Sequence, residues 1–239
     1  MSLTFDLPTA PVWPSSENPR KLFIFSHTKT GKTSAVMQIP NNLLIDLESW
    51  SQYYSGFKID VKEFSKRNSI TMFSALWHAI SALRNKQEKY DYITIDTVTA
   101  LEDIACEYAL SLYKQSPMWK NYTGSNILNL ANWAWHAWVR EAFDKIYDSF
   151  EWLYNKWIIF LWHVKSSSIM KDWESISARD INLTGKLKYI LSADVDAIWY
   201  LYRNKETNQN IISFKTTETD LACWARPNHL KWKDFIISE

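Results

Sequence analysis

The chain has 239 residues, of which 46% are hydrophobic and 22% are charged, and its formal net charge is +1. This length can bury a core, and the composition is that of a globular protein rather than a disordered or fibrous one. The near-neutral charge excludes a general attraction for nucleic acid, so any such binding must come from a local patch. The two cysteines match no metal-binding spacing, and neither a signal peptide nor a membrane-spanning run is found. We therefore expect a cytoplasmic protein without membrane contact.

The predicted elements begin after a polar, proline-rich stretch at residues 1–20, which we expect to form an extended arm before a single domain at 21–239. Short apolar runs predict buried strands at 21–26, 42–47, 90–96 and 157–163. Helices are predicted at 32–38, 74–88, 101–115 and 139–154. A small hairpin is predicted at 53–64, irregular structure at 116–136, and an antiparallel pair at 196–203 and 210–216.

This alternation of strands and helices predicts an α/β domain with a mainly parallel central sheet and helices on both faces. The last pair of strands predicts an antiparallel C-terminal edge. Ligands of such sheets bind at the carboxyl ends of the parallel strands. The residues that follow each buried strand are therefore the candidates for a functional site.

The segment SHTKTGKT, residues 26–33, follows the first predicted strand. Its end is typical of a phosphate-binding loop, in which backbone N–H groups wrap phosphate oxygens, a lysine reaches the β- and γ-phosphates and a hydroxyl binds Mg²⁺. We expect Lys32 and Thr33 to fill the last two roles, with ATP and Mg²⁺ as cofactors. The expected nucleotide-binding residues are Ser26, His27, Thr28, Lys29, Thr30, Gly31, Lys32, Thr33 and Ser34. The alternative is a chance GKT sequence at the start of a helix.

One position departs from the loop pattern, because Ser26 stands where a glycine normally opens the loop. A small side chain costs less there than a branched one, but the tight turn loses conformational freedom. The sequence therefore leaves open whether Ser26 impairs hydrolysis.

Acidic residues end two further predicted strands. Asp96 closes YITID and is the expected second Mg²⁺ ligand, although it also fits a cap of the following helix. Asp46 and Glu48 lie at the tip of the strand predicted at 42–47, and Glu48 has the chemistry to polarise the attacking water. The alternative for Glu48 is a solvated strand end.

The succession TGKT, LLIDLE, YDYITIDT and IIFLWHVK resembles the RecA-like branch of P-loop ATPases. It is similar in particular to phage-encoded AAA-family ATPases and nucleotide-binding proteins, some of which are RecA-like single-strand-annealing recombinases. The resemblance extends from about residue 20 to the C-terminus. It implies that Glu48 is the catalytic base, beside the catalytic Lys32, and that His163 senses the γ-phosphate.

The same resemblance implies that a DNA-binding loop follows His163. Residues 164–188 are locally basic, which fits binding of single-stranded DNA. The alternative is a solvated loop that only borders the nucleotide. The basic residues are Lys165, Lys171, Arg179, Lys186 and Lys188. RecA-like ATPases usually work as homo-oligomers, and Lys215 is a candidate, by analogy only, for a charge given to a neighbour's site.

Three functions compete at this point. The first is an ATPase acting in phage DNA recombination or replication. The second is a P-loop kinase or another phosphotransferase, which needs an arginine-rich lid that the sequence does not display and which gives Glu48 no role. The third is a non-catalytic nucleotide-binding protein with a decayed loop.

Tryptophan and glycine are present in unusual numbers. Average usage of about 7% predicts roughly 17 glycines, whereas the chain has 4 glycines and 14 tryptophans. Some bacterial lineages and their phages read UGA as glycine, and translating such a gene with UGA as tryptophan produces this pattern. The positions at which we expect glycine are Trp50, Trp119, Trp133, Trp135, Trp162, Trp173, Trp199, Trp224 and Trp232. The alternative is an aromatic-rich protein whose indoles stack on single-stranded bases; neither reading explains Ser26.

Overall fold

The computed structural model describes residues 10, 16–86, 89–151, 153, 156–171, 174–184, 186–217 and 223–237. The first half contains β1 (Lys21–Ser26), α1 (Lys32–Met37), β2 (Asn42–Asp46), β3 (Phe57–Asp60), α2 (Val61–Asn68), α3 (Met72–Lys86), β4 (Tyr92–Asp96) and α4 (Val98–Gln115). The second half contains α5 (Trp135–Glu151), β5 (Trp157–Lys171), β6 (Glu174–Ile181), α6 (Leu187–Asp194), β7 (Ala197–Arg203), β8 (Asn210–Ser213), β9 (Trp224–Ala225) and β10 (Asp234–Ile237).

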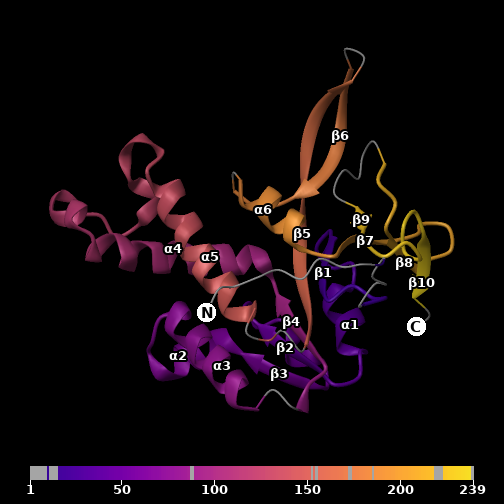
Figure 1. Ribbon diagram of the computed structural model, residues 1–239, viewed down its shortest axis with the longest axis horizontal. Helices are drawn as coiled ribbons and strands as arrows, with labels where there is room; N and C mark the ends of the chain where they lie inside the picture. Colours follow the sequence, from indigo (N-terminus) through magenta and orange to yellow (C-terminus); the bar gives the residue numbers. More distant parts are fainter. Residues whose placement is uncertain are drawn as a thin grey trace.

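The strands form one mixed sheet in the order β10-β8-β7-β1-β5-β4-β2-β3, with β6 pairing β5 and β9 pairing β7 (Figure 1). The stretch from β7 to β3 is parallel throughout, and β8 and β10 add an antiparallel edge. The four predicted buried strands are thus adjacent, in the order β1-β5-β4-β2. The predicted α/β class, parallel centre and antiparallel C-terminal edge are confirmed.

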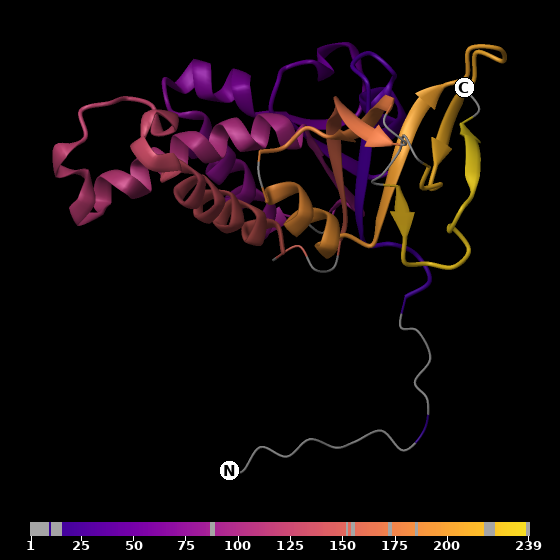
Figure 2. The ribbon, with the colours of Figure 1, turned by 90° about the horizontal axis from the view of Figure 1, so that it is seen from above.

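Helices cover the two faces of the sheet unequally. Alternate strand residues point to opposite faces, because side chains in a strand alternate with a period of two. Phe23 and Phe25 of β1 belong to a large core cluster with residues of α2, α3, α4, α5 and α6, whereas Leu22 and Ile24 face a smaller cluster with α1 and the C-terminal strands. Figure 2 shows most of the helices gathered on one side of the strands.

A buried polar network fixes α1 against the second face. The Thr94 hydroxyl donates to Asn42 Oδ1 at 2.9 Å, and Asn42 Nδ2 donates to the Val36 carbonyl of α1 at 2.8 Å. Both polar side chains are buried and both are satisfied, which removes the cost of burying them. The helix that follows the phosphate-binding loop is therefore tied to β2 and β4.

Two predicted elements differ from the structure. The hairpin expected at 53–64 is wrong: β3 pairs in parallel with β2 and leads into α2, whose N-cap is Asp60. The loop expected after His163 is instead an antiparallel arm, because β5 continues to Lys171 and pairs with β6. Figure 1 shows this arm projecting beyond the rest of the sheet.

The N-terminal arm predicted at residues 1–20 lies mostly outside the described residues. Its last residue is attached to the sheet, since the Arg20 backbone N–H donates to Asp196 Oδ2 at 2.8 Å and the Arg20 carbonyl accepts from Ile158 at 2.8 Å. In the part of the chain that the structure describes, no helix combines the length and apolar character needed to cross a bilayer.

Candidate functional site

The candidate residues converge on one edge of the sheet, where β1, β5, β4 and β2 end. Ser26 is in register with His163 across β1 and β5, and Asp46 is in register with Asp96 across β2 and β4. Strand β5 separates β1 from β4, so residues of the loop after β1 must reach across it to meet Asp96. Four segments that are distant in sequence are thereby brought to one site.

The loop after β1 turns through a left-handed glycine into α1. Gly31 has φ 97° and stands at the N-cap of α1, where a side chain would be strained, and its carbonyl accepts from Ala35 at 2.9 Å. Lys29 is also left-handed, with φ 63°. Within the turn, the Thr30 hydroxyl donates to the His27 carbonyl at 2.9 Å. The first residues of α1 thus present their backbone N–H groups toward the loop, which is the arrangement that binds phosphate.

Ser26 fits its position without a glycine conformation. It is the last residue of β1, it is fully buried, and it is not among the described residues with positive φ. Its hydroxyl donates to the His27 carbonyl at 2.8 Å and accepts from Lys32 Nζ at 3.0 Å. The departure from the loop pattern therefore causes no backbone strain and adds a contact to the lysine.

Lys32 lies with its ammonium group folded back into the loop. Nζ donates to Ser26 Oγ and, at 3.2 Å, to the His27 carbonyl. Burial lowers the pKa of Lys32 from 10.5 to about 8, against the opposing influence of Asp96 and Glu48. Among the residues that the structure describes, only neutral oxygens accept from this buried ammonium, so it lacks a full counter-charge, which an anionic phosphate would supply.

Thr33 and Asp96 form a hydroxyl–carboxylate pair. Thr33 Oγ1 donates to Asp96 Oδ2 at 2.7 Å. Burial raises the pKa of Asp96 from 3.8 to about 6, with the nearby Asp46 and Glu48 acting in the same direction. A desolvated carboxylate beside a hydroxyl is a donor set that Mg²⁺ prefers, and the cation would offset the cost of burying the charge. The residues present thus fit Mg²⁺.

Asp96 does not cap the following helix, which was its alternative role. The N-cap of α4 is Thr97, whose side chain accepts from the Ala100 backbone N–H at 3.3 Å. Asp96 is consequently left facing Thr33.

Glu48 is half-buried and its carboxylate is held by two neighbours. Thr97 Oγ1 donates to Glu48 Oε2 at 3.0 Å, and His163 Nε2 lies 3.7 Å from the same oxygen. The pKa of Glu48 is lowered, first by the contact with His163 and then by Thr97 and Lys32, against the opposing effect of burial. The carboxylate is therefore ionised near neutral pH, which is the form that accepts a proton from water.

Asp46 has a structural role in placing Glu48. Its Oδ1 accepts from the backbone N–H groups of Glu48 and Ser49 at 2.9 and 2.7 Å, and its Oδ2 accepts from Ser51 at 2.8 Å. The carboxylate thus closes the turn after β2, in which Ser49 has φ 64°. Its position two residues before Glu48 in the sequence gives no sign of this role.

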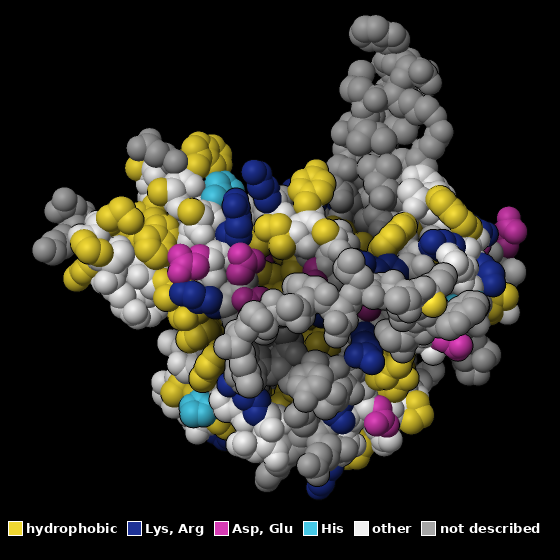
Figure 3. Space-filling view, in the orientation of Figure 1, with side chains coloured by type: hydrophobic (Ala, Val, Ile, Leu, Met, Phe, Trp, Pro, Cys, Tyr) yellow, Lys and Arg dark blue, Asp and Glu magenta, His cyan; other side chains and the backbone are white. Residues whose placement is uncertain are grey.

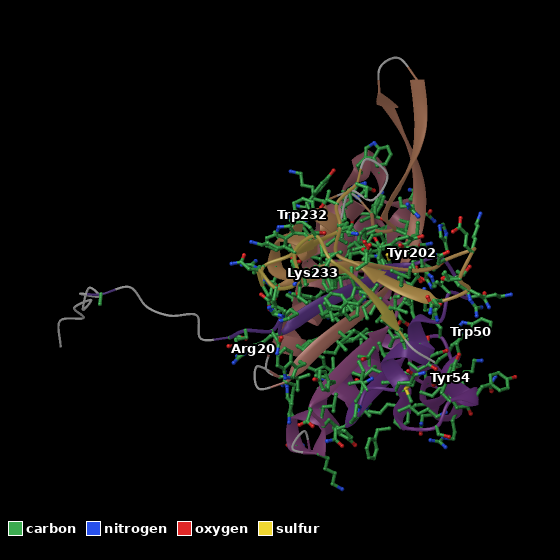
Figure 4. All side chains as sticks on the ribbon, turned by 90° about the vertical axis from the view of Figure 1, so that its right-hand side faces the viewer. Arg20, Trp50, Tyr54, Tyr202, Trp232 and Lys233 are labelled. Carbon is green, nitrogen blue, oxygen red and sulfur yellow. The ribbon has the colours of Figure 1, made fainter. Side chains whose placement is uncertain are left out.

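Two contacts of the site involve residues that sequence reasoning missed. Thr97 was not singled out, because a threonine before a helix is a routine N-cap. Tyr54 lies over the first turn of α1, where its hydroxyl accepts from Ser34 Oγ at 2.9 Å. Figure 4 shows Tyr54 close to Trp50, on the turn that follows β2. No short-range signal links Tyr54 to the loop, since the contact depends on how the sheet brings the segments together.

The basic residues after His163 are spread over several environments. Lys165 is exposed at the base of the arm, whereas the Arg179 guanidinium lies 4.5 Å from the Tyr200 ring centre and donates to its hydroxyl at 3.1 Å. Lys186 is exposed before α6, and Lys188 lies over the Tyr189 ring at 4.8 Å. The side chain of Lys171 lies outside the described part of the structure. On the face shown in Figure 3, described basic and acidic side chains are interspersed rather than gathered into one patch.

Lys215 lies just beyond β8, at the antiparallel edge of the sheet. Its Nζ forms an ion pair with Asp234 Oδ2 of β10. This intramolecular partner fits a solvated lysine at the sheet edge better than a charge given to a neighbour's site.

Comparison with known proteins agrees with this geometry. A family model described as an AAA domain matches residues 18–222, which is most of the chain. A search of curated proteins finds no match. The match covers the loop after β1, both acidic strand ends and the arm, and the chain therefore belongs to the AAA domain family of P-loop ATPases.

Proposed function

We propose that the chain binds ATP with Mg²⁺ and hydrolyses it, and that it acts on single-stranded DNA during phage recombination or replication. The observation that carries the ATPase proposal is the convergence of Lys32, the Thr33–Asp96 pair and Glu48 on one sheet edge. A phosphate-binding loop alone is also consistent with simple nucleotide binding. An ionised carboxylate fixed near it supplies the group that hydrolysis additionally requires.

In this proposal each residue has one task. The N–H groups at the start of α1 and the ammonium of Lys32 would bind the phosphates, and Thr33 and Asp96 would hold a cation, which would neutralise developing charge. Glu48 accepts the proton of the attacking water, and His163, close to Glu48, contacts the γ-phosphate. Most of the catalysis comes from positioning and charge, because the phosphoryl transition state requires little covalent chemistry from the protein.

Two substitutions test the ATPase proposal. Lys32→Ala removes the phosphate contact, and we expect loss of both hydrolysis and nucleotide binding. Glu48→Gln removes only the proton acceptor, and we expect binding to persist while kcat falls by about 100-fold or more. Glu63→Gln changes an exposed glutamate of α2 and is the matched control. Normal hydrolysis by Glu48→Gln would show that the base is wrongly assigned.

The DNA part of the proposal is supported by the arm. Strand β5 runs without a break from the sheet edge that carries His163 into the arm, and Lys165 is exposed at the start of the arm. A nucleotide-dependent contact at His163 would therefore lie on the same strand as a candidate DNA contact, two residues before Lys165. Stimulation of ATP hydrolysis by single-stranded DNA is the test; nucleotide binding without any hydrolysis would instead favour a non-catalytic protein, and phosphate transfer to a small acceptor would favour a kinase.

A further inference from the structure

We infer that Thr97 is a positioning residue for Glu48. The side chain is 1% exposed, lies directly after Asp96, and donates from Oγ1 to Glu48 Oε2 at 3.0 Å. The same hydroxyl oxygen accepts from the Ala100 N–H at 3.3 Å, which fixes the direction in which the hydroxyl hydrogen points. One threonine thus links the start of α4 to the carboxylate that follows β2.

The geometry selects one oxygen of the carboxylate. Both Thr97 Oγ1 and His163 Nε2 approach Glu48 Oε2, at 3.0 and 3.7 Å. Among the described residues, none donates a hydrogen bond to Glu48 Oε1. The hydrogen bond from Thr97 therefore restricts rotation of the carboxylate and leaves Oε1 as the oxygen available to accept from water. Since a flexible proton acceptor spends less time in the productive geometry, loss of this contact should slow turnover without weakening nucleotide binding.

This inference rests on the proposed function of Glu48, and the experiment separates the two. In Thr97→Val, which keeps the shape but loses the hydroxyl, we expect kcat to fall by about 10- to 100-fold with an unchanged KM for ATP. Thr97→Ser retains both hydrogen bonds and should restore most of kcat. A Thr97→Val variant that keeps normal kcat while Glu48→Gln is inactive would overturn only the positioning role, whereas an active Glu48→Gln would remove the proposed base itself. A parallel loss of kcat in Thr97→Val and Thr97→Ser would mean that Thr97 only supports the fold.

A second and independent observation concerns the tryptophans. We propose that the protein carries glycine at positions 133 and 232, where the printed chain has tryptophan. Trp133 and Trp232 have φ 59° and 60°, in the left-handed region. That region is accessible to glycine at no steric cost, whereas a bulky side chain there is a rare outlier.

Both indoles lie mostly in solvent, and Trp133 stacks on His136 with the ring centres 5.6 Å apart. Trp133 is 74% exposed and Trp232 is 63% exposed, so neither buries its ring in a core. Figure 4 shows Trp232 at the periphery of the C-terminal strands. Each position therefore combines a backbone that suits glycine with an indole that stays largely exposed, whereas a structural tryptophan buries most of its ring.

The other tryptophan positions differ in how well their surroundings suit an indole. Trp199 has a buried Nε1 with no hydrogen-bond partner, which is costly for a real indole. Trp50 has φ −94° and does not need glycine, although it is 68% exposed. Trp162 is fully buried 4.8 Å from the Phe23 ring centre and donates from Nε1 to Asn182 at 3.3 Å, so its contacts suit an indole. Trp173 lies outside the described residues.

Peptide mass spectrometry of the chain made in its own cells tests this proposal. We expect the peptides that contain positions 133 and 232 to have the mass for glycine, and the gene to carry UGA at both codons. UGG codons there, or peptides with the mass for tryptophan, would overturn it. In recombinant protein made with tryptophan at these positions, Trp133→Gly and Trp232→Gly should raise the melting temperature. Trp77→Gly, which changes an exposed tryptophan inside α3, is the control and should lower it. Lowering by all three substitutions would count against glycine at positions 133 and 232.

Discussion

Lys32 determines how the affinity for ATP should depend on pH. Its pKa is about 8 in the free protein, because burial disfavours the ammonium form. Bound phosphate favours that form, so ATP binding above about pH 8 must take up a proton, and the affinity should fall as the pH rises through this value. Calorimetric titration at several pH values, in buffers of different ionisation enthalpy, measures both effects. A dissociation constant that does not change between about pH 7 and 9.5 would contradict the assignment.

Burial of Asp96 should lower the stability of the metal-free protein while it creates a ligand for a metal ion. Its pKa is raised from 3.8 to about 6 in the folded protein, so its ionised form is less favourable there than in the unfolded chain. The stability without metal should therefore decrease as the pH rises from about 4 to 6, and stay low above that range. Asp96→Asn removes the buried charge, still accepts from Thr33, and should raise the free energy of unfolding at pH 8 by on the order of 2 kcal/mol.

The same substitution should remove the response to the cation. We expect Mg²⁺ with ATP to stabilise the parent chain in chemical denaturation and to leave Asp96→Asn nearly unchanged, with loss of hydrolysis. Asp91, which accepts from Asn41 at the other end of β4, is the control position for Asp→Asn. If Asp96→Asn were less stable than the parent without metal, burial would not be the dominant influence on this carboxylate.

At the scale of the elements, the arm connects the candidate nucleotide site to a distant surface. His163 is the last residue of β5 that pairs with β1, and Val164 is the first that pairs with β6. A γ-phosphate contact at His163 would bias the arm between two arrangements, which is how nucleotide switches act. We expect His163→Ala to bind DNA equally with ATP and with ADP, unlike the parent chain.

The basic residues of the arm should set the affinity itself. A Lys165→Ala/Lys171→Ala double variant should bind single-stranded DNA more weakly in both nucleotide states, and its salt dependence should be shallower because fewer phosphates are contacted. A Lys231→Ala/Lys233→Ala double variant, in the turn before β10, removes the same number of charges and is the matched control. If neither variant differs from the parent, or the parent binds no DNA, a nucleotide-hydrolysing domain of unknown target remains.

The elements also show which features the sequence can predict. The four buried strands were predictable because each is a short apolar run that ends at a polar residue, and the loop at 26–33 because its residues are contiguous. The arm was not, since residues 164–181 are polar and lack a regular apolar alternation, so their pairing depends on backbone hydrogen bonds between β5 and β6. The parallel pairing of β3 with β2 was missed for a related reason. The Ser55-Gly56 pair is typical of a hairpin turn, which would join antiparallel neighbours, whereas β3 pairs in parallel with β2.

Within the site, contiguous features were predictable and spatial contacts were not. Lys32, Thr33 and Gly31 are recognisable from their spacing. The contact between Thr97 and Glu48 joins two strand ends that are 49 residues apart, and nothing local in either segment marks it. The sequence likewise placed Asp46 beside Glu48 at one strand end without giving it a role, and its hydrogen bonds to the turn after β2 show that it holds that turn.

At the scale of the whole molecule, the antiparallel edge is the surface on which we expect subunits to meet. Phe235 and Ile236 of β10 are 40% and 61% exposed on a strand that pairs with β8. An exposed apolar edge strand is a template for association. We expect sedimentation with ATP to show oligomers, and Ile236→Lys to shift them toward monomers without loss of folding. Only monomers in the parent chain, with and without DNA, would exclude a homo-oligomer under those conditions.

Because β5 is continuous, a small rotation at the base of the arm would produce a larger displacement at its far end. The eight steps along the strand from His163 to Lys171 span about 26 Å at the usual rise per residue. A tilt of about 10° at the base would then displace the far end by about 5 Å, although the atoms beside the nucleotide move by only a fraction of an ångström. An antiparallel pair transmits such a rotation better than a flexible loop, because inter-strand hydrogen bonds oppose bending along its length. Release of one phosphate would thereby be converted into a stroke comparable to the spacing between successive nucleotides of an extended strand.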